Sequence, residues 1–69
     1  MLERGTKVRS SSGSEYVITE FIRSKDFNAG NHSNLFNIDY YYAYSEHGRV
    51  EIEVKYEPHK EEILGVRVV

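Results

Sequence analysis

Side chains that could carry out chemistry are scattered along this chain rather than clustered. The sequence has no cysteine and three histidines. The histidines, each expected in a different loop or turn, are His32, His47 and His59. A metal site needs several ligands close together, and a nucleophilic site needs a base beside its serine or cysteine. Because neither arrangement is visible, the sequence predicts a protein with no catalytic residues, no metal site and no cofactor.

Two glutamates, Glu51 and Glu53, are the nearest approach to a carboxylate pair for acid–base catalysis. They alternate along a predicted strand, so both would point to its solvated face. A tyrosine among such carboxylates can instead anchor a protein partner and attract basic residues. The candidate partner-binding residues are Phe27, Asp39, Tyr41, Glu51 and Glu53.

Four of these candidates lie in residues 35–57, a stretch whose pattern predicts a β-hairpin. Its even positions are apolar or aromatic, and period two is typical of a strand with one buried face. A three-residue loop, residues 46–48, would place even positions opposite each other, with Gly48 in the left-handed conformation. The predicted pairs are Tyr44 with Val50, Tyr42 with Ile52, Tyr40 with Val54 and Ile38 with Tyr56.

This register sends the odd-numbered side chains of the hairpin into solvent. Asp39 would lie opposite Lys55 as an opposite-charge pair, and Tyr41 would lie opposite Glu53. The expected outer face is therefore acidic and carries one tyrosine.

The rest of the chain predicts three more strands, at residues 5–9, 15–23 and 63–69. The second has apolar residues on both faces, which is typical of a central or sharply bent strand. Residues 24–34 read as a loop rich in asparagine, glycine and serine. There Phe27 either folds back onto the core or serves as an exposed anchor. Pro58 ends the hairpin and would begin one helical turn, and Gly65 would mark a bend or bulge.

We expect residues 1–69 to form one all-β domain. Two arrangements remain open: a small five-stranded SH3-like barrel whose last strand closes against the first, or a strongly bent antiparallel sheet that dimerises through an edge. The start of the chain, Gly5-Thr6-Lys7-Val8-Arg9-Ser10, then Gly13 and Tyr16-Val17-Ile18, is similar to the G-x-x-V start of small bacterial, KOW- and Tudor-type barrels. That resemblance implies an SH3-like architecture.

Composition and charge limit the classes of function that we expect, but they do not identify one. The chain has 69 residues and a net charge of −2, with an acidic second half. The first residues do not resemble a secretory signal, no apolar run could span a bilayer, and the lack of cysteine fits the cytoplasm, so we expect a cytoplasmic protein. Our first hypothesis is a protein-binding module with a basic partner, such as an adaptor, an assembly subunit or a phage-type inhibitor.

Two further hypotheses concern other surfaces. The resemblance to KOW- and Tudor-type barrels implies a nucleic-acid binder, and the basic residues available for it lie in the first third of the chain. They are Arg4, Lys7, Arg9, Arg23 and Lys25. The third hypothesis is a homo-oligomer formed edge to edge through the last strand, residues 63–69.

Overall fold

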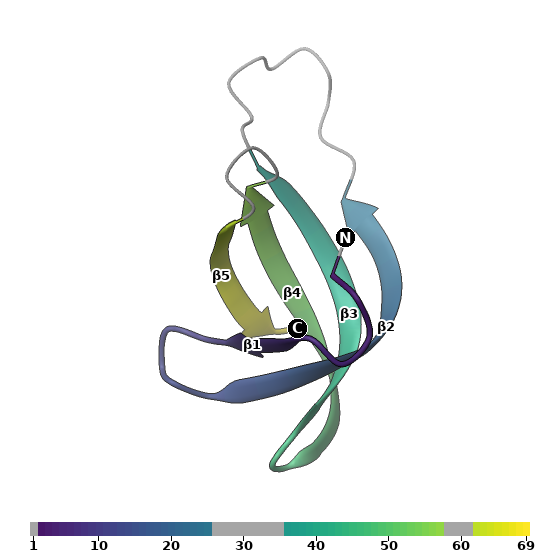
Figure 1. Ribbon diagram of the computed structural model, residues 1–69, viewed down its shortest axis with the longest axis vertical. Coiled ribbons are helices and arrows are strands. Elements are labelled where there is room, and N and C mark those ends of the chain that lie inside the picture. Colours follow the sequence, from purple (N-terminus) through teal and green to yellow (C-terminus); the bar gives the residue numbers. More distant parts are fainter. Residues whose placement is uncertain (1, 26–35, 58–61) are drawn as a thin grey trace.

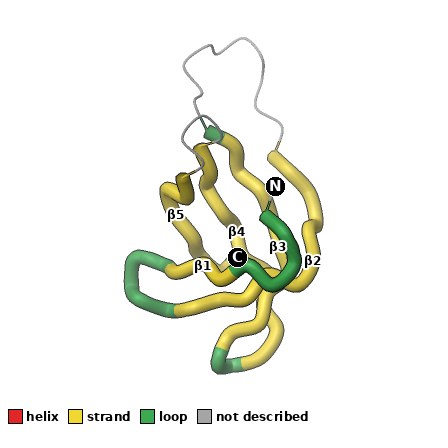
Figure 2. The backbone as a smooth tube through the Cα atoms, in the orientation of Figure 1, coloured by secondary structure: helices red, strands yellow, loops and turns green. Residues whose placement is uncertain are grey.

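The computed structural model describes residues 2–25, 36–57 and 62–69, and these residues form five β-strands (Figures 1 and 2). They are β1 (Lys7–Arg9), β2 (Glu15–Lys25), β3 (Asn37–Ser45), β4 (Gly48–Glu57) and β5 (Glu62–Val68). Each strand pairs antiparallel with the next, in the order β1-β2-β3-β4-β5. The sheet curls into a nearly closed barrel, which confirms the all-β prediction.

Some sequence predictions fall on residues that the structure does not describe. They are the conformation of Phe27 and the helical turn beginning at Pro58. The described residues form no helix, so this part of the chain has no helix that could cross a membrane.

β2 is the strand that bends the sheet into a barrel. Its ladder with β3 shifts register twice, between Ile18 and Glu20 and between Phe21 and Arg23. Each shift inserts an extra residue, and such bulges bend a strand and increase its twist. Figure 1 shows β2 curving round one side of the barrel from β1 to the far end of β3. The predicted sharp bend in this segment is therefore confirmed.

The predicted closure between the last strand and the first is wrong. In the described part of the chain β5 is hydrogen-bonded to β4 and not to β1. The segment before β1 follows β2 instead, because Gly5 N–H donates to the Ile18 carbonyl (2.7 Å) and Ile18 N–H donates to the Thr6 carbonyl (2.9 Å). This pairing holds β1 beside β2, so the seam between β1 and β5 stays open.

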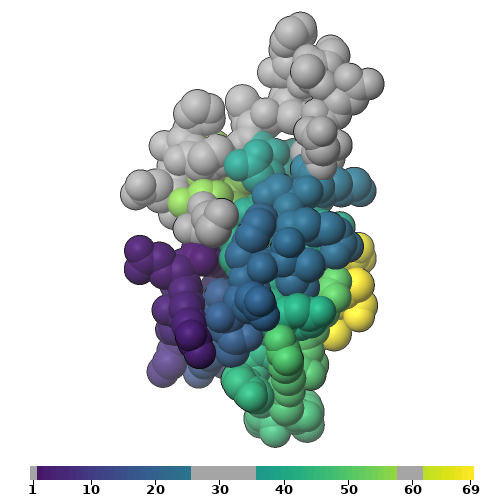
Figure 3. Space-filling model, turned by 90° about the vertical axis from the view of Figure 1, so that its right-hand side faces the viewer, coloured from purple at the N-terminus to yellow at the C-terminus, as the bar shows by residue number. Residues whose placement is uncertain are grey.

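The β3–β4 hairpin forms as predicted, but its register is not the predicted one. Ser45 pairs with Gly48, so the turn contains only Glu46 and His47. The Ser45 hydroxyl closes this short turn by accepting from His47 N–H and donating to the Gly48 carbonyl, each at 3.1 Å. Gly48 has a φ of 107°, which confirms the expected left-handed glycine. Figure 3 shows the green hairpin tip projecting below the rest of the domain.

The shorter turn exchanges the two faces of β3. A register shift of one residue turns every side chain of a strand to the other face. Tyr41 now lies opposite Ile52 and Asp39 opposite Val54, and all four side chains are buried. The expectation that Asp39 and Tyr41 face solvent is therefore wrong, as is the predicted pairing of Asp39 with Lys55.

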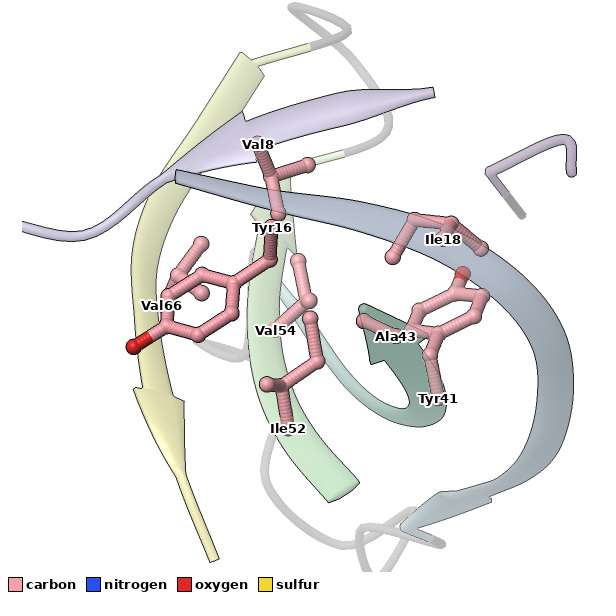
Figure 4. Packing of buried hydrophobic residues seen from close by; sticks show 8 residues of the cluster. All are labelled: Val8, Tyr16, Ile18, Tyr41, Ala43, Ile52, Val54 and Val66. Carbon is pink, nitrogen blue, oxygen red and sulfur yellow. The ribbon is translucent and has the colours of Figure 1, made fainter. Parts of the chain in front are cut away.

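Every strand contributes to one small core (Figure 4). Its members are Val8 from β1, Tyr16 and Ile18 from β2, Tyr41 and Ala43 from β3, Ile52 and Val54 from β4, and Val66 from β5. The tyrosine ring of Tyr41 meets Phe21 edge to face, with centroids 5.6 Å apart. Leu2 packs against the outside of this cluster, so the N-terminal segment covers part of the core.

Candidate surface site: the tyrosine–arginine face

The outer surface of the sheet carries a row of three tyrosines along β3. Tyr40, Tyr42 and Tyr44 point away from the core because they alternate with the buried Tyr41 and Ala43. Tyr44 is 56% exposed, and the other two are half-buried under neighbouring side chains. We call this surface the tyrosine–arginine face. It comprises Glu20, Arg23, Tyr40, Tyr42, Tyr44, Arg49, Glu51, Glu53 and Arg67.

The first row of the face crosses four strands through Tyr40. Register places Arg23 and Glu53 on either side of Tyr40, and Arg67 beyond Glu53. The Arg23 guanidinium carbon lies 4.2 Å from the centre of the Tyr40 ring. The Tyr40 hydroxyl donates to Glu53 Oε2 at 3.0 Å, and Arg67 Nε donates to Glu53 Oε1 at 2.9 Å. The row is thus a continuous chain of contacts from β2 to β5.

These contacts shift the pKa values of two members of that row. The hydrogen bond from Arg67 holds the pKa of the Glu53 carboxyl below its usual value of 4.5, and the Tyr40 hydroxyl acts in the same direction. Donating its proton to Glu53 raises the pKa of Tyr40 above its usual 10.0. Glu53 is therefore an ionised, hydrogen-bonded anchor of the face rather than a group poised to exchange protons.

The second row is centred on Tyr42, which lies between Glu20 and Glu51. Arg49 covers this ring, with its guanidinium carbon 4.3 Å from the ring centre, and reaches Glu20 at 3.5 Å. Glu51 in turn lies 3.9 Å from Arg23. Each glutamate of the face therefore has an arginine within ion-pairing distance, and the face carries no net formal charge.

A different set of contacts holds the tyrosine on the inner side of β3. The Tyr41 hydroxyl accepts from Leu2 N–H at 2.9 Å and donates to Asp39 Oδ2 at 3.2 Å. Asp39 Oδ1 accepts from the Ser24 hydroxyl at 2.6 Å. Burial, together with the Asp39 charge, raises the pKa of Tyr41, while the Leu2 N–H opposes the shift. This buried network ties the N-terminal segment and the end of β2 to β3.

The structure places two of the sequence-predicted site residues on the surface and two in the core. Glu51 and Glu53 lie on the outer face as expected, whereas Asp39 and Tyr41 are inside and cannot touch a partner. Sequence reasoning missed Tyr40, Tyr42 and Tyr44, which it assigned to the core. Residue type alone did not identify them, because the set that is buried, Asp39, Tyr41 and Ala43, is the less apolar of the two.

No other chemical site is visible among the described strands and turns. In residues 2–25, 36–57 and 62–69 there is no group of three or more histidine, aspartate or glutamate side chains that could hold a metal ion. His47 is in the exposed β3–β4 turn, 3.4 Å from Glu46. Comparisons of this chain with protein-family models, with curated proteins and with solved structures give no match.

Proposed function

We propose that this domain is a small non-enzymatic protein-binding module that docks a partner on the tyrosine–arginine face. The observation that carries the proposal is the row of Tyr40, Tyr42 and Tyr44, with arginines stacked on the first two rings. Tyrosine and arginine are the residue types that, with tryptophan, most often dominate binding energy at protein interfaces.

The contacts within the face support binding because they reduce its entropic cost. Arg23 and Arg49 are long side chains that would otherwise lose rotamer freedom when a partner docks. Both are already placed by a ring and a glutamate. Tyr44, at the end of the row and 56% exposed, is the ring most available for a partner pocket.

The partner in this proposal is a protein of basic net charge. The face itself is balanced, so attraction comes from the whole domain, whose sequence pI is about 5.9. A net charge of −2 accelerates encounter with a basic partner more than it strengthens the final complex. Adaptor, assembly subunit and phage-type inhibitor remain the roles we propose for such a module.

The SH3-like classification also belongs to this proposal. A nearly closed barrel of five antiparallel strands supports it at the level of architecture. The pairing of β5 with β4 rather than β1 departs from the closure that we expected for such a barrel.

Affinity capture from the native host, followed by titration of the purified partner, tests the proposal. We expect Tyr42→Ala with Tyr44→Ala to weaken binding at least tenfold, or by about 1.4 kcal/mol, while circular dichroism stays unchanged. Lys7→Ala, an exposed change on β1, is the matched control and should bind like the wild type. An unchanged dissociation constant for the double variant would remove this face from consideration.

A second candidate function is binding of single-stranded nucleic acid on the same tyrosine row. Aromatic side chains on a sheet, with arginines beside them, are typical of surfaces on which bases stack. Against it, the arginines of the face are matched by glutamates. The predicted basic patch is also split, because Arg9 pairs with Glu15 at one end of β2 while Arg23 and Lys25 lie near the other.

Gel shifts with single-stranded and duplex probes discriminate the two functions. A nucleic-acid binder should bind at about 50 mM salt and weaken steeply as salt rises. Loss of the shift in the Tyr42→Ala, Tyr44→Ala variant would assign it to this face. No shift at that salt concentration excludes the class.

A further inference from the structure

The last strand exposes apolar side chains in a way that the rest of the described surface does not. Four large hydrophobic residues are exposed in the described part of the chain. One is Tyr44, and the other three are Leu64 (46% exposed), Val68 (49%) and Val69 (67%). Soluble proteins normally protect a free sheet edge with charges, proline or a covering segment. In β5 the charged residues are Glu62 and Arg67, and the remaining side chains are apolar.

The backbone of β5 is also free on one side within the described residues. One edge pairs with β4, from Ile52 opposite Val68 to Glu57 opposite Glu62. Val69 N–H donates to the Glu51 carbonyl at 3.0 Å, which continues the same ladder. Because backbone groups alternate in direction along a strand, those of Val66 and Val68 point away from β4. They form the free edge.

A groove runs beside this edge. It has a volume of about 500 Å³ and lies between β5 and the end of β1 with its turn. Its walls are Arg9, Ser10 and Ser11 on one side and Ile63 to Arg67 on the other, with Glu53 and Lys55 of β4 also lining it. It lies along the seam of the barrel, where β5 is not hydrogen-bonded to β1. An extended segment against β5 would cover its apolar residues.

The sequence of β5 is complementary to itself in an antiparallel pairing. When Glu62 is set opposite Arg67 of a second copy, two-fold symmetry creates the same charge pair again at the other end. Ile63 then lies opposite Val66, and both point to the core side, since they face Tyr56 and Val54 of their own β4. Glu62 and Arg67 both point to the outer side, opposite Glu57 and Glu53. The two faces of the strand therefore match in both apolar and charged positions.

We propose that β5 is a self-association edge, through which a second copy of this chain pairs antiparallel with Glu62 opposite Arg67. The interface joins two short strands and buries less than the roughly 1,200 Å² of a standard interface, so the dimer is weak and reversible. It shares with the tyrosine–arginine face only Arg67 and Glu53, which are bonded to each other and both line the groove. The inference does not depend on the proposed function.

Sedimentation equilibrium over loading concentrations from about 10 to 500 μM tests the dimer. The average mass should rise from 8.1 kDa toward twice that value. Leu64→Lys with Val68→Lys places edge charges at two exposed positions and should weaken association at least tenfold, because lysine opposes edge pairing. Glu3→Lys, which adds a lysine at an exposed position before β1, is the matched control and should associate like the wild type.

A charge-exchange experiment tests the register. Glu62→Arg alone and Arg67→Glu alone each set like charges opposite one another at both ends, so each variant should be monomeric. An equimolar mixture sets opposite charges at both ends and should recover the dimer. A wild type that stays at 8.1 kDa throughout, a lysine variant that associates like the wild type, or a mixture that remains monomeric would overturn the proposal.

Discussion

Tyrosines on the two faces of β3 are held by different kinds of contact, although the residue type is the same. Tyr41 is fully buried, and its hydroxyl bonds Leu2 N–H and Asp39. Tyr40 lies outside, covered by Arg23 and bonded to Glu53. The ring is apolar and the hydroxyl is polar, so tyrosine suits either face when its hydroxyl has a partner. The neighbours of a tyrosine, rather than the tyrosine itself, decide which face is core.

Truncating one ring on each face gives the largest expected contrast. Tyr41→Ala should lower the free energy of unfolding by about 3–5 kcal/mol, because it leaves a cavity in a small core. For a chain of 69 residues, that loss is a large share of a stability on the order of 0.1 kcal/mol per residue. Tyr44→Ala should stay within about 0.5 kcal/mol. Urea denaturation of both variants measures the difference, and equal losses would contradict the assignment of faces.

Removing only the hydroxyl of Tyr41 should have a smaller effect. Tyr41→Phe keeps the ring packed against Phe21 but leaves Asp39 and the Leu2 N–H each without one partner. The expected loss is about 1–3 kcal/mol, the cost of unpaired buried polar groups. Tyr44→Phe is the control on the outer face and should be nearly neutral. If both variants unfold at the same urea concentration, the buried network contributes no stability.

The row of contacts through Glu53 should make the free energy of unfolding decrease at acidic pH. The pKa of Glu53 is lowered in the folded state, so its contribution is present above pH 4.5, the usual value, and is lost as pH falls through the lowered pKa. The free energy of unfolding of Glu53→Gln should therefore depend less on pH in the acidic range. Arg67→Gln should reduce this dependence in part, because it removes the principal hydrogen-bond donor to Glu53. Thermal denaturation between about pH 2 and 6 measures this dependence. The same pH dependence of stability in the wild type and both variants would show that this row does not stabilise the fold.

The smallest predicted effect is the stacking of Arg49 on Tyr42. A double-mutant cycle with Arg49→Gln and Tyr42→Leu should give a coupling of about 0.5 kcal/mol, typical of an exposed cation–π pair. The same cycle with Arg9→Gln is the control. Arg9 pairs with Glu15 at the start of β2 and should not couple to Tyr42. A coupling equal to that of the control would mean that the contact between Arg49 and Tyr42 does not stabilise the fold.

Much of the fold could be predicted from local patterns. The alternation in β4 correctly placed Ile52 and Val54 inside. Apolar residues on both faces predicted the bend in β2, and Gly65 marked the register shift that leaves Leu64 unpaired in the ladder with β4. Each of these signals is contained in a few adjacent residues.

The face of β3 could not be predicted by the same means. The apolar pattern of β3 favours its even-numbered residues, because the odd-numbered set contains Asn37, Asp39 and Ser45, so the pattern indicated the wrong face. The observed face follows from the length of the turn. Ser45 closes a two-residue turn with its side chain, a contact that turn-type preferences do not indicate. With the turn one residue shorter, Asp39 and Tyr41 moved inside, while Glu51 and Glu53 kept their predicted face. The path of β1 along β2 likewise depends on distant backbone contacts.

Cross-strand nuclear Overhauser effects in the β3–β4 hairpin test the central claim most directly, because they report the register of β3 against β4. We predict backbone contacts of Tyr41 with Ile52 and of Ala43 with Val50. Contacts of Tyr42 with Ile52 and of Tyr44 with Val50 would contradict this prediction, since they would return the three outer tyrosines to the core.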